Sequence, residues 1–165
     1  MTNNTLRNVA LVGCNRIPFA RQNTAYTLAS NQDMMVAALN GLIDRYRLHG
    51  QLLGEVAGGA VVKHSWEFNL MRESVMGTML NPATPACDIQ QACDTGIEAA
   101  IYIANKIATG QIEVGISGGV DSSSNVPLFL NEPIRKILLA ARRAKTTGER
   151  ISRLLKIRLK DFIPL

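Results

Sequence analysis

The sequence of 165 residues contains no long hydrophobic run, few aromatic side chains and only two histidines. A membrane-spanning helix needs about 18 or more consecutive apolar residues, so we expect no membrane span. The three cysteines form no Cys-x-x-Cys pair and no grouping with His49 or His64, so no metal site is expected. The first residues, Met-Thr-Asn-Asn-Thr, lack the basic stretch and apolar block of a secretory signal.

What is present is ordinary for a globular protein: 47% apolar and 19% charged residues. The charge is uneven along the chain. Residues 1–130 hold 8 basic and 10 acidic side chains, whereas residues 131–165 hold 10 basic and 3 acidic ones. A basic block can attract phosphate groups. Because no aromatic residues are interleaved with it, we expect a solvated basic face and no nucleic-acid partner.

The hydrophobic pattern alternates between strand-like and helix-like segments. Apolar runs predict strands over 8–13, 55–62, 86–92 and 112–117, and helical periodicity predicts helices over 31–47, 68–80 and 95–108. We expect the helix over 95–108 to be well buried, because one face of it is nearly all aliphatic. Strand–helix repetition of this kind predicts an α/β fold with a mixed sheet and helices packed on it.

The pattern changes after residue 120. Residues 121–125 are polar and loop-like, and the basic segments 132–144 and 149–160 could form short amphipathic helices. We therefore divide the chain into an α/β half-domain over 1–120 and a basic, partly helical region over 121–165.

Cys93 is the candidate catalytic residue, because it lies where an apolar strand ends and a helix begins. The first turn of a helix has unpaired N–H groups and partial positive charge, which stabilise a thiolate and an oxyanion nearby. The alternative is a buried structural cysteine, which is the interpretation we favour for Cys14 and Cys87. An odd number of cysteines with a candidate thiolate fits a reducing compartment, and we expect a cytoplasmic protein.

The residues around Cys93 extend this interpretation. Residues 90–100, Gln-Gln-Ala-Cys-Asp-Thr-Gly-Ile-Glu-Ala-Ala, resemble the nucleophile motif of the thiolases. Three more segments resemble thiolases in order and spacing. They are the opening strand over 8–13 with Arg-Ile-Pro-Phe at 16–19, the Gly-Gly-Ala-Val-Val run at 58–62, and the Gly-Gly-Val-Asp-Ser-Ser-Ser loop at 118–124.

The resemblance implies a thiolase-like N-terminal half-domain followed by the start of the family's loop domain. It implies acyl transfer between coenzyme A thioesters, as in 3-ketoacyl-CoA thiolysis or acetoacetyl-CoA formation in fatty-acid metabolism. Cys93 would be the nucleophile that carries the acyl thioester. No tightly bound cofactor is implied; coenzyme A thioesters are the substrates. Thiolases pair through their N-terminal halves, so a homodimer or homotetramer is expected.

Three family motifs have no counterpart in these residues: the Gly-His-Pro base, the Asn-Glu-Ala-Phe asparagine and the Cys-x-Gly second cysteine. We therefore expect this chain alone to be inactive, with a C-terminal thiolase half on another chain as a candidate partner. The alternative is a non-catalytic module that oligomerises. Asp94 stands where the family usually has glycine; its carboxylate could oppose a thiolate or cap the helix.

Overall fold

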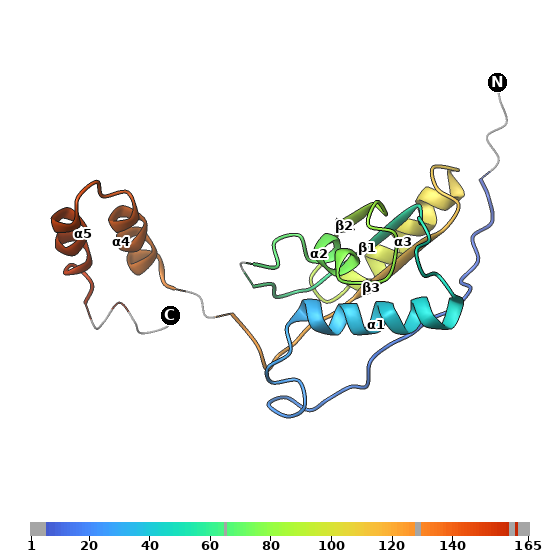
Figure 1. The fold of residues 1–165 in the computed structure, drawn as a ribbon, viewed down its shortest axis with the longest axis horizontal. Helices are drawn as coiled ribbons and strands as arrows, with labels where there is room; N and C mark the ends of the chain where they lie inside the picture. The colour runs from blue at the N-terminus through green and yellow to red at the C-terminus, as the bar shows by residue number, and fades with distance from the viewer. Residues whose placement is uncertain (1–5, 65, 128–129, 159–160, 162–165) are drawn as a thin grey trace, which may run out of the picture. The chain divides into compact units, whose positions relative to one another are not determined.

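The computed structural model describes residues 6–64, 66–127, 130–158 and 161. The chain divides into two compact units, Met1–Pro127 and Leu128–Leu165. The first unit contains the sheet, and Figure 1 shows its strands with helices packed on both sides. The second unit consists of two short helices.

The sheet of the first unit has three parallel strands in the order β2-β1-β3. They are β1 (Glu55–Gly59) in the centre, β2 (Ala86–Asp88) on one side and β3 (Gly115–Gly119) on the other. In this register, Val56 lies opposite Ala86 of β2 and Ile116 of β3. The central strand is completely buried, as expected for a parallel sheet covered on both faces.

Three helices cover the two faces of this sheet. α1 (Asn31–Tyr46) and α2 (Leu70–Met76) pack on one face, and α3 (Thr95–Ala108) packs on the other. The connection from β1 to β2 crosses the sheet toward one edge, and the connection from β2 to β3 crosses it toward the opposite edge. Because such crossovers are right-handed, α2 and α3 must lie on opposite faces. The structure is therefore an α/β half-domain, as predicted.

Successive side chains of β1 point to opposite faces of the sheet, and this divides the hydrophobic core into two clusters. Val56 faces α1 and α2, and its neighbour Ala57 faces α3; both are fully buried. The larger cluster, on the side of α1 and α2, contains Met35, Leu39, Ile43, Leu53, Val56, Met71, Val75 and Leu80. The smaller cluster is built on Ala57, Ala99 and Ile103.

α1 begins with a capping box. The Ser30 hydroxyl accepts a hydrogen bond from Asp33 N (3.0 Å), and the Asp33 carboxylate accepts one from Ser30 N (2.9 Å). Hydrogen bonds from the Ser30 side chain and backbone lower the pKa of the Asp33 carboxyl. A charged Asp33 at the positive end of the helix thus fixes where α1 begins.

A charged cluster at the start of β1 anchors α3 to the sheet. The buried Glu55 carboxylate pairs with Lys106 and accepts a hydrogen bond from the Tyr102 hydroxyl (3.2 Å). The hydrogen bond to Glu55, and a second one to Tyr102, raise the pKa of Lys106. Since a buried carboxylate is costly unless it is paired, these two partners are what allow a glutamate at this position.

The predicted strand over residues 8–13 is wrong. Residues 6–20 have no helix or strand, and Leu11 is 93% exposed. The segment runs antiparallel along α1, with Gly13 beside Tyr46, and Asn15 Nδ2 donates to Ala38 O (2.8 Å). An apolar run becomes a strand only when a neighbouring edge receives its N–H and C=O groups, and none of the described strands does so here.

The prediction that α3 is well buried is also wrong. Its buried residues are Thr95, Ala99 and Ile103, whereas Ile97 is 65% exposed and Ile101 is about half exposed. The helix is apolar on two sides, and the sheet covers one of them. Periodicity located the helix but could not tell which apolar side meets the sheet.

The other predicted elements are present with shifted ends. The strands are shorter than or displaced from the predicted runs, and α2 is shorter than 68–80. In the second unit, α4 (Glu132–Arg142) and α5 (Thr147–Leu154) fall within or near the predicted segments 132–144 and 149–160, of which residues 159–160 lie outside the described residues. The two helices pack on each other around Ile134 and Ala141, and Arg153 Nη1 donates to Ala140 O (2.9 Å).

Candidate functional site

The candidate site lies where the three parallel strands end. Three loops leave this edge of the sheet: 60–64 after β1, 89–94 after β2 and 120–125 after β3. In open parallel sheets the carboxyl ends of the strands form the usual ligand-binding edge. All three loops carry residues of segments that the sequence singled out: 58–62, 90–100 and 118–124.

The loops after β1 and β3 are joined by one carboxylate. Asp121 Oδ1 accepts hydrogen bonds from Val61 N (2.9 Å) and Val62 N (3.2 Å). The loop after β2 joins the same point, because Gln90 Nε2 donates to Val61 O (3.0 Å). The sequence predicted only a polar loop at Asp121; an aspartate two residues beyond a strand is a signal for a loop-capping role of this kind.

His64 has a structural role in the same region. It is buried, its ring stacks on Trp66, and Nε2 lies 2.8 Å from Asn125 O. The fully buried Glu67 accepts hydrogen bonds from His64 N (3.0 Å) and from the Asn31 side chain (3.3 Å). The other histidine, His49, pairs with Asp44 (2.9 Å) at the far end of α1. Among the described residues, neither histidine makes a hydrogen bond to Cys93.

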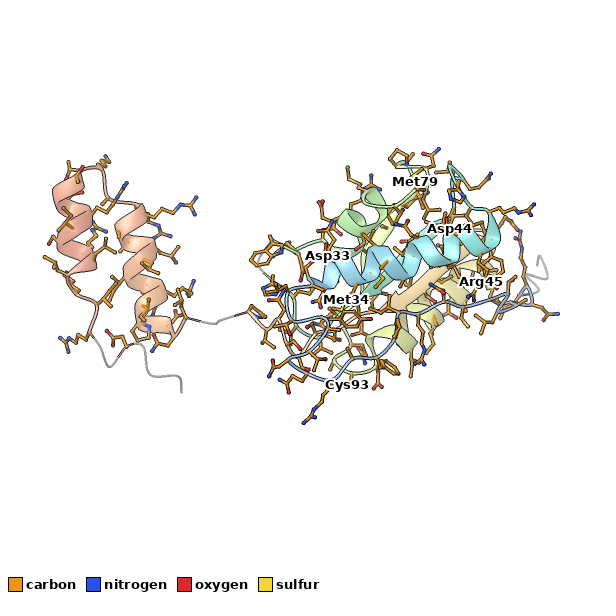
Figure 2. The ribbon with its side chains drawn as sticks, turned by 60° about the horizontal axis from the view of Figure 1, so that its bottom comes forward. Asp33, Met34, Asp44, Arg45, Met79 and Cys93 are labelled. Carbon is orange, nitrogen blue, oxygen red and sulfur yellow. The ribbon has the colours of Figure 1, made fainter. Side chains whose placement is uncertain are left out.

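Cys93 is exposed and directly precedes Asp94, the N-cap residue of α3. Figure 2 shows it at the periphery of the first unit. The prediction that α3 spans 95–108 is confirmed, so Cys93 comes two residues before the first turn of the helix, where N–H groups lack partners within the helix. Asp94 occupies the cap position, but its side chain makes no capping hydrogen bond.

The backbone strain of this turn falls on Ala92, not on Asp94. Ala92 has φ +46°, in the left-handed region, whereas Asp94 has φ −93°. The position after the thiol therefore does not need the conformational freedom of glycine. A left-handed conformation costs a non-glycine residue about 1–2 kcal/mol, and such residues cluster at functional sites.

Thr95 holds the strained turn in place. Its hydroxyl donates to Ala92 O (2.7 Å) and accepts from Gln91 N (2.9 Å), and the side chain is buried. Sequence reasoning did not single out Thr95, although a threonine in the first helical turn after a strand is a general signal for such a bond. The thiol is thus presented by a turn whose two flanking peptide groups are fixed.

Two glycines allow close backbone approaches at the ends of the strands. A Cβ on Gly119 of β3 would lie 3.4 Å from Gly96 Cα of α3, and a Cβ on Gly59 of β1 would lie 2.1 Å from Ile89 O in the loop after β2. The backbone of α3 therefore packs directly on the end of β3. This approach places the first helical turn at the edge of the sheet.

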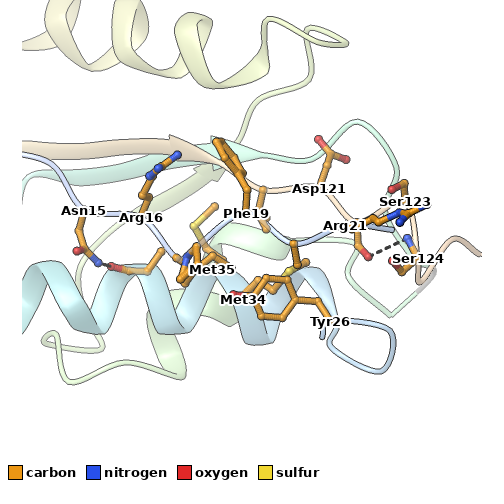
Figure 3. Close-up of a pocket in the computed structure, with 17 residues that line it drawn as sticks. Asn15, Arg16, Phe19, Arg21, Tyr26, Met34, Met35, Asp121, Ser123 and Ser124 are labelled. Atoms are coloured by element: carbon orange, nitrogen blue, oxygen red, sulfur yellow. Dashed lines mark hydrogen bonds between the residues drawn. The ribbon is translucent and has the colours of Figure 1, made fainter. Parts of the chain in front are cut away.

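A cavity of about 250 Å³ lies nearby, between residues 15–21, the first turns of α1 and the loop over 119–124. Figure 3 shows Phe19, Met35 and Asp121 among the residues that line it. Two of the segments that carried the resemblance, 16–19 and 118–124, thus come together here. Cys93 is not among the residues that line this cavity.

The three thiols differ in their surroundings. Cys14 is exposed, so the interpretation of Cys14 as a core residue is wrong; it lies on the unpaired segment along α1. Cys87 is partly buried on β2, and burial raises the pKa of its thiol. Within the described residues no group of three His, Cys, Asp or Glu side chains is arranged to hold a metal ion, and no helix is long and apolar enough to cross a membrane.

These features define a three-layer α/β protein that presents an exposed cysteine immediately before a helix, at the carboxyl edge of a parallel sheet. A solved structure with this fold is the crystal structure of the Bacillus anthracis acetyl-CoA acetyltransferase. It matches with a TM-score of 0.74 and 24% sequence identity over 78% of this chain and 33% of that one. At this identity the match shows the fold.

The family profile described as "Thiolase, N-terminal domain" matches residues 9–155. The chain therefore belongs to the thiolase family, as the resemblance predicted. It is 35% identical over its whole length to the 3-ketoacyl-CoA thiolase of Shewanella amazonensis, of which it covers 38%. It is 36% identical over 95% of its length to the 3-ketoacyl-CoA thiolase of Shewanella denitrificans, of which it covers 36%.

Proposed function

We propose that the chain is the N-terminal part of a thiolase-type acyltransferase, in which Cys93 is the nucleophile that accepts the acyl group. The observation that carries this proposal is the exposed thiol at the start of α3, held by a strained and hydrogen-bonded turn in a chain of the thiolase family. The proposed substrates are 3-ketoacyl-CoA and coenzyme A, because the relatives named above are 3-ketoacyl-CoA thiolases. Three unpaired thiols favour a reducing compartment such as the cytoplasm.

In the proposed reaction, the Cys93 thiolate attacks the 3-keto carbon of the substrate and forms an S–C bond. The bond between C2 and C3 breaks, and its electron pair leaves as the enolate of acetyl-CoA, which takes a proton. The sulfur of a second coenzyme A then attacks the thioester and releases the Cys93 thiolate. The positive end of α3 favours the thiolate and the oxyanion that forms at the attacked carbon.

Two proton transfers in this sequence need a base and an acid beside the sulfur. Among the described residues no acid or base forms a hydrogen bond with Cys93: His64 is bonded to Asn125 O, and His49 is paired with Asp44. When catalytic groups act as a unit, removing any one of them removes most of the activity. We therefore propose that this chain alone does not catalyse the reaction, and that a C-terminal thiolase half supplies the missing acid and base.

The test is the rate at which the three thiols react with iodoacetamide in the folded chain at pH 7, followed by peptide mass mapping. We expect Cys93 to be labelled several-fold faster than Cys14, which is equally exposed but lies on no helix end, and Cys87 to be slowest. Cys14→Ser is the matched control and should leave Cys93 labelling unchanged. Equal rates at Cys93 and Cys14 would contradict the proposed activation.

A second candidate function is a non-catalytic module that associates with itself. The observation that favours it is the exposed apolar side of α3, with Ile97 and Ile101 open to solvent. Light scattering at micromolar concentration separates the candidates. A homodimer or larger oligomer that the Ile97→Asp substitution dissociates into monomers supports association through α3. A monodisperse monomer at these concentrations argues against it.

A further inference from the structure

The two glutamines that precede Ala92 and Cys93 have different surroundings, and the proposed reaction gives neither of them a role. The Gln90 side chain spans two of the loops at the carboxyl edge of the sheet. Its Nε2 donates to Val61 O in the loop after β1 (3.0 Å), and its Oε1 lies 3.3 Å from the Thr95 hydroxyl oxygen. Among the described residues, Gln91 enters this network through its backbone alone, and both glutamines are exposed.

On one side, a peptide group connects Gln90 to a carboxylate. The C=O of the group between Val61 and Val62 accepts the bond from Gln90, and its N–H donates to Asp121 Oδ1 (3.2 Å). Val61 N donates to the same carboxylate oxygen (2.9 Å). Because hydrogen bonds in a chain polarise one another, the carboxylate makes this C=O a better acceptor for the Gln90 amide. The Nε2 end of Gln90 is therefore fixed at a point to which the loops after β1 and β3 both contribute.

On the other side, Gln90 reaches the turn before Cys93 through Thr95. The Thr95 hydroxyl has one proton, directed to Ala92 O (2.7 Å), and Gln90 Oε1 is a second acceptor for it at 3.3 Å. The hydroxyl oxygen accepts from Gln91 N (2.9 Å). A hydroxyl group rotates to suit its partners. Three partners around it restrict this rotation, so Gln90 helps to set the direction of the bond that holds Ala92.

The turn needs this restraint, because Ala92 lies in the left-handed region with φ +46°. A non-glycine residue persists in this conformation only where the surrounding structure holds it there. Ala92 and Cys93 are both exposed, so side-chain packing contributes little to holding them. The hydrogen bonds of the turn therefore supply most of the restraint.

We propose that Gln90 is a positioning residue for Cys93, because its amide links the loop after β1 to the Thr95 hydroxyl and so holds the turn that carries the thiol. The inference rests on the proposed role of Cys93 as the nucleophile. It adds the residue through which the loops after β1 and β3 act on that thiol. Because Gln90 is exposed, its replacement should change the global stability little, so an effect on Cys93 would not result from unfolding.

The test compares iodoacetamide labelling of Cys93, as a function of pH, in the full parent chain, Gln90→Met and the matched control Gln91→Met. Methionine has a similar length and no amide, and both variants keep every backbone N–H group. We expect Gln90→Met to slow labelling at pH 7 by about threefold or more and to move the midpoint of the pH profile upward, because a displaced thiol loses the positive end of α3. Gln91→Met should change neither quantity, and the urea midpoint of Gln90→Met should match that of the parent chain.

A double-mutant cycle shows whether Gln90 acts through Thr95. Thr95→Val should slow Cys93 labelling at least as much as Gln90→Met does. Adding Gln90→Met to Thr95→Val should then have little further effect, because the hydroxyl that Gln90 restrains is gone. Amide hydrogen exchange at Gln91 gives a second measure that does not depend on the thiol. We expect it to be about threefold faster or more in Gln90→Met, because the N–H group of Gln91 bonds to the Thr95 hydroxyl.

The outcomes separate this inference from the proposed function. Unchanged Cys93 labelling and unchanged Gln91 exchange in Gln90→Met would overturn the inference, even where Cys93 of the parent chain reacts faster than Cys14. Equal effects of Gln90→Met and Gln91→Met, or additive effects of Gln90→Met and Thr95→Val, would overturn it as well. Equal labelling of Cys93 and Cys14 in the parent chain would contradict the proposed function instead, and Gln91 exchange would still decide whether Gln90 holds the turn.

Discussion

The hydroxyl of Thr95 donates a hydrogen bond of 2.7 Å to the carbonyl oxygen of Ala92, the residue directly before the candidate nucleophile. Ala92 has φ +46°, which an L-residue adopts only at a cost. The same hydroxyl accepts from Gln91 N (2.9 Å), so one buried side chain holds the peptide group before Gln91 and the one after Ala92. The backbone before Cys93 is therefore held by the Thr95 side chain.

Replacing Thr95 by valine keeps the shape of the side chain and removes both hydrogen bonds. The Gln91 N–H group loses its partner, and Ala92 O keeps only the longer bond from Thr95 N (3.3 Å), so we expect the free energy of unfolding to fall by about 1–3 kcal/mol. Urea denaturation measures this change. Thr109→Val is the control, because Thr109 lies exposed at the other end of α3, where its hydroxyl bonds to the last turn of the helix and to the Gln111 side chain. An equal loss for both variants would show that Thr95 does not hold the turn.

Ala92→Gly should act in the opposite direction. Glycine adopts positive φ without a steric penalty, so this variant should raise the free energy of unfolding by about 1 kcal/mol. The gain is smaller than the full strain because glycine also loses more backbone entropy on folding. A shift of the urea midpoint at constant m-value reports the effect. A destabilised Ala92→Gly chain would mean that the Ala92 methyl group contributes packing that outweighs the strain.

Gly59 and Gly118 provide a matched pair on neighbouring strands. A Cβ at Gly59 would meet Ile89 O at 2.1 Å, whereas a Cβ at Gly118 would have nothing within 4 Å. We expect Gly59→Ala to reduce the free energy of unfolding by about 1–3 kcal/mol, since backbone must move to admit the methyl group, and Gly118→Ala to change it little. Thermal unfolding of the two variants under identical conditions checks the difference. Similar midpoints would exclude the close approach of β1 to the loop after β2.

Much of this architecture was predictable from the sequence, because local patterns determine it. The spacing of apolar residues predicted α1 and α3 within a residue of their ends, and Gly110, which has φ +73°, follows the C-cap of α3. The position of Cys93 before α3 followed from the same pattern. These features depend on residues within a few positions of one another.

The features that were missed depend on partners distant in the sequence. The run over 8–13 carries the composition of a strand, yet its pairing depends on an edge that no local signal describes. Asp121 was expected to be a plain loop residue, and its bonds to Val61 and Val62 arise only because β1 and β3 end side by side. The exposure of Ile97 likewise depends on which side of α3 meets the sheet.

Glu132 gives a prediction about pH in the second unit. Its carboxylate accepts two hydrogen bonds from the Arg135 guanidinium (2.7 and 2.8 Å), which lower the pKa of Glu132 to about 2. A carboxyl whose pKa is lower in the folded state stabilises it above the unfolded pKa, about 4.3 for glutamate, and this contribution disappears as the pH falls through 2. Glu132→Gln should therefore reduce the helix content of α4 at pH 7, where the charge also lies at the favourable N-terminal end of the helix.

A double-mutant cycle isolates the contribution of the pair. Far-UV circular dichroism is compared for the parent chain, Glu132→Gln, Arg135→Gln and the combined variant. If the pair stabilises α4, the second substitution should have little further effect at pH 7, and all four spectra should converge below pH 2. High salt should reduce the difference, because both side chains are exposed. Additive effects of the two substitutions at pH 7 would show that the two residues act on the helix independently.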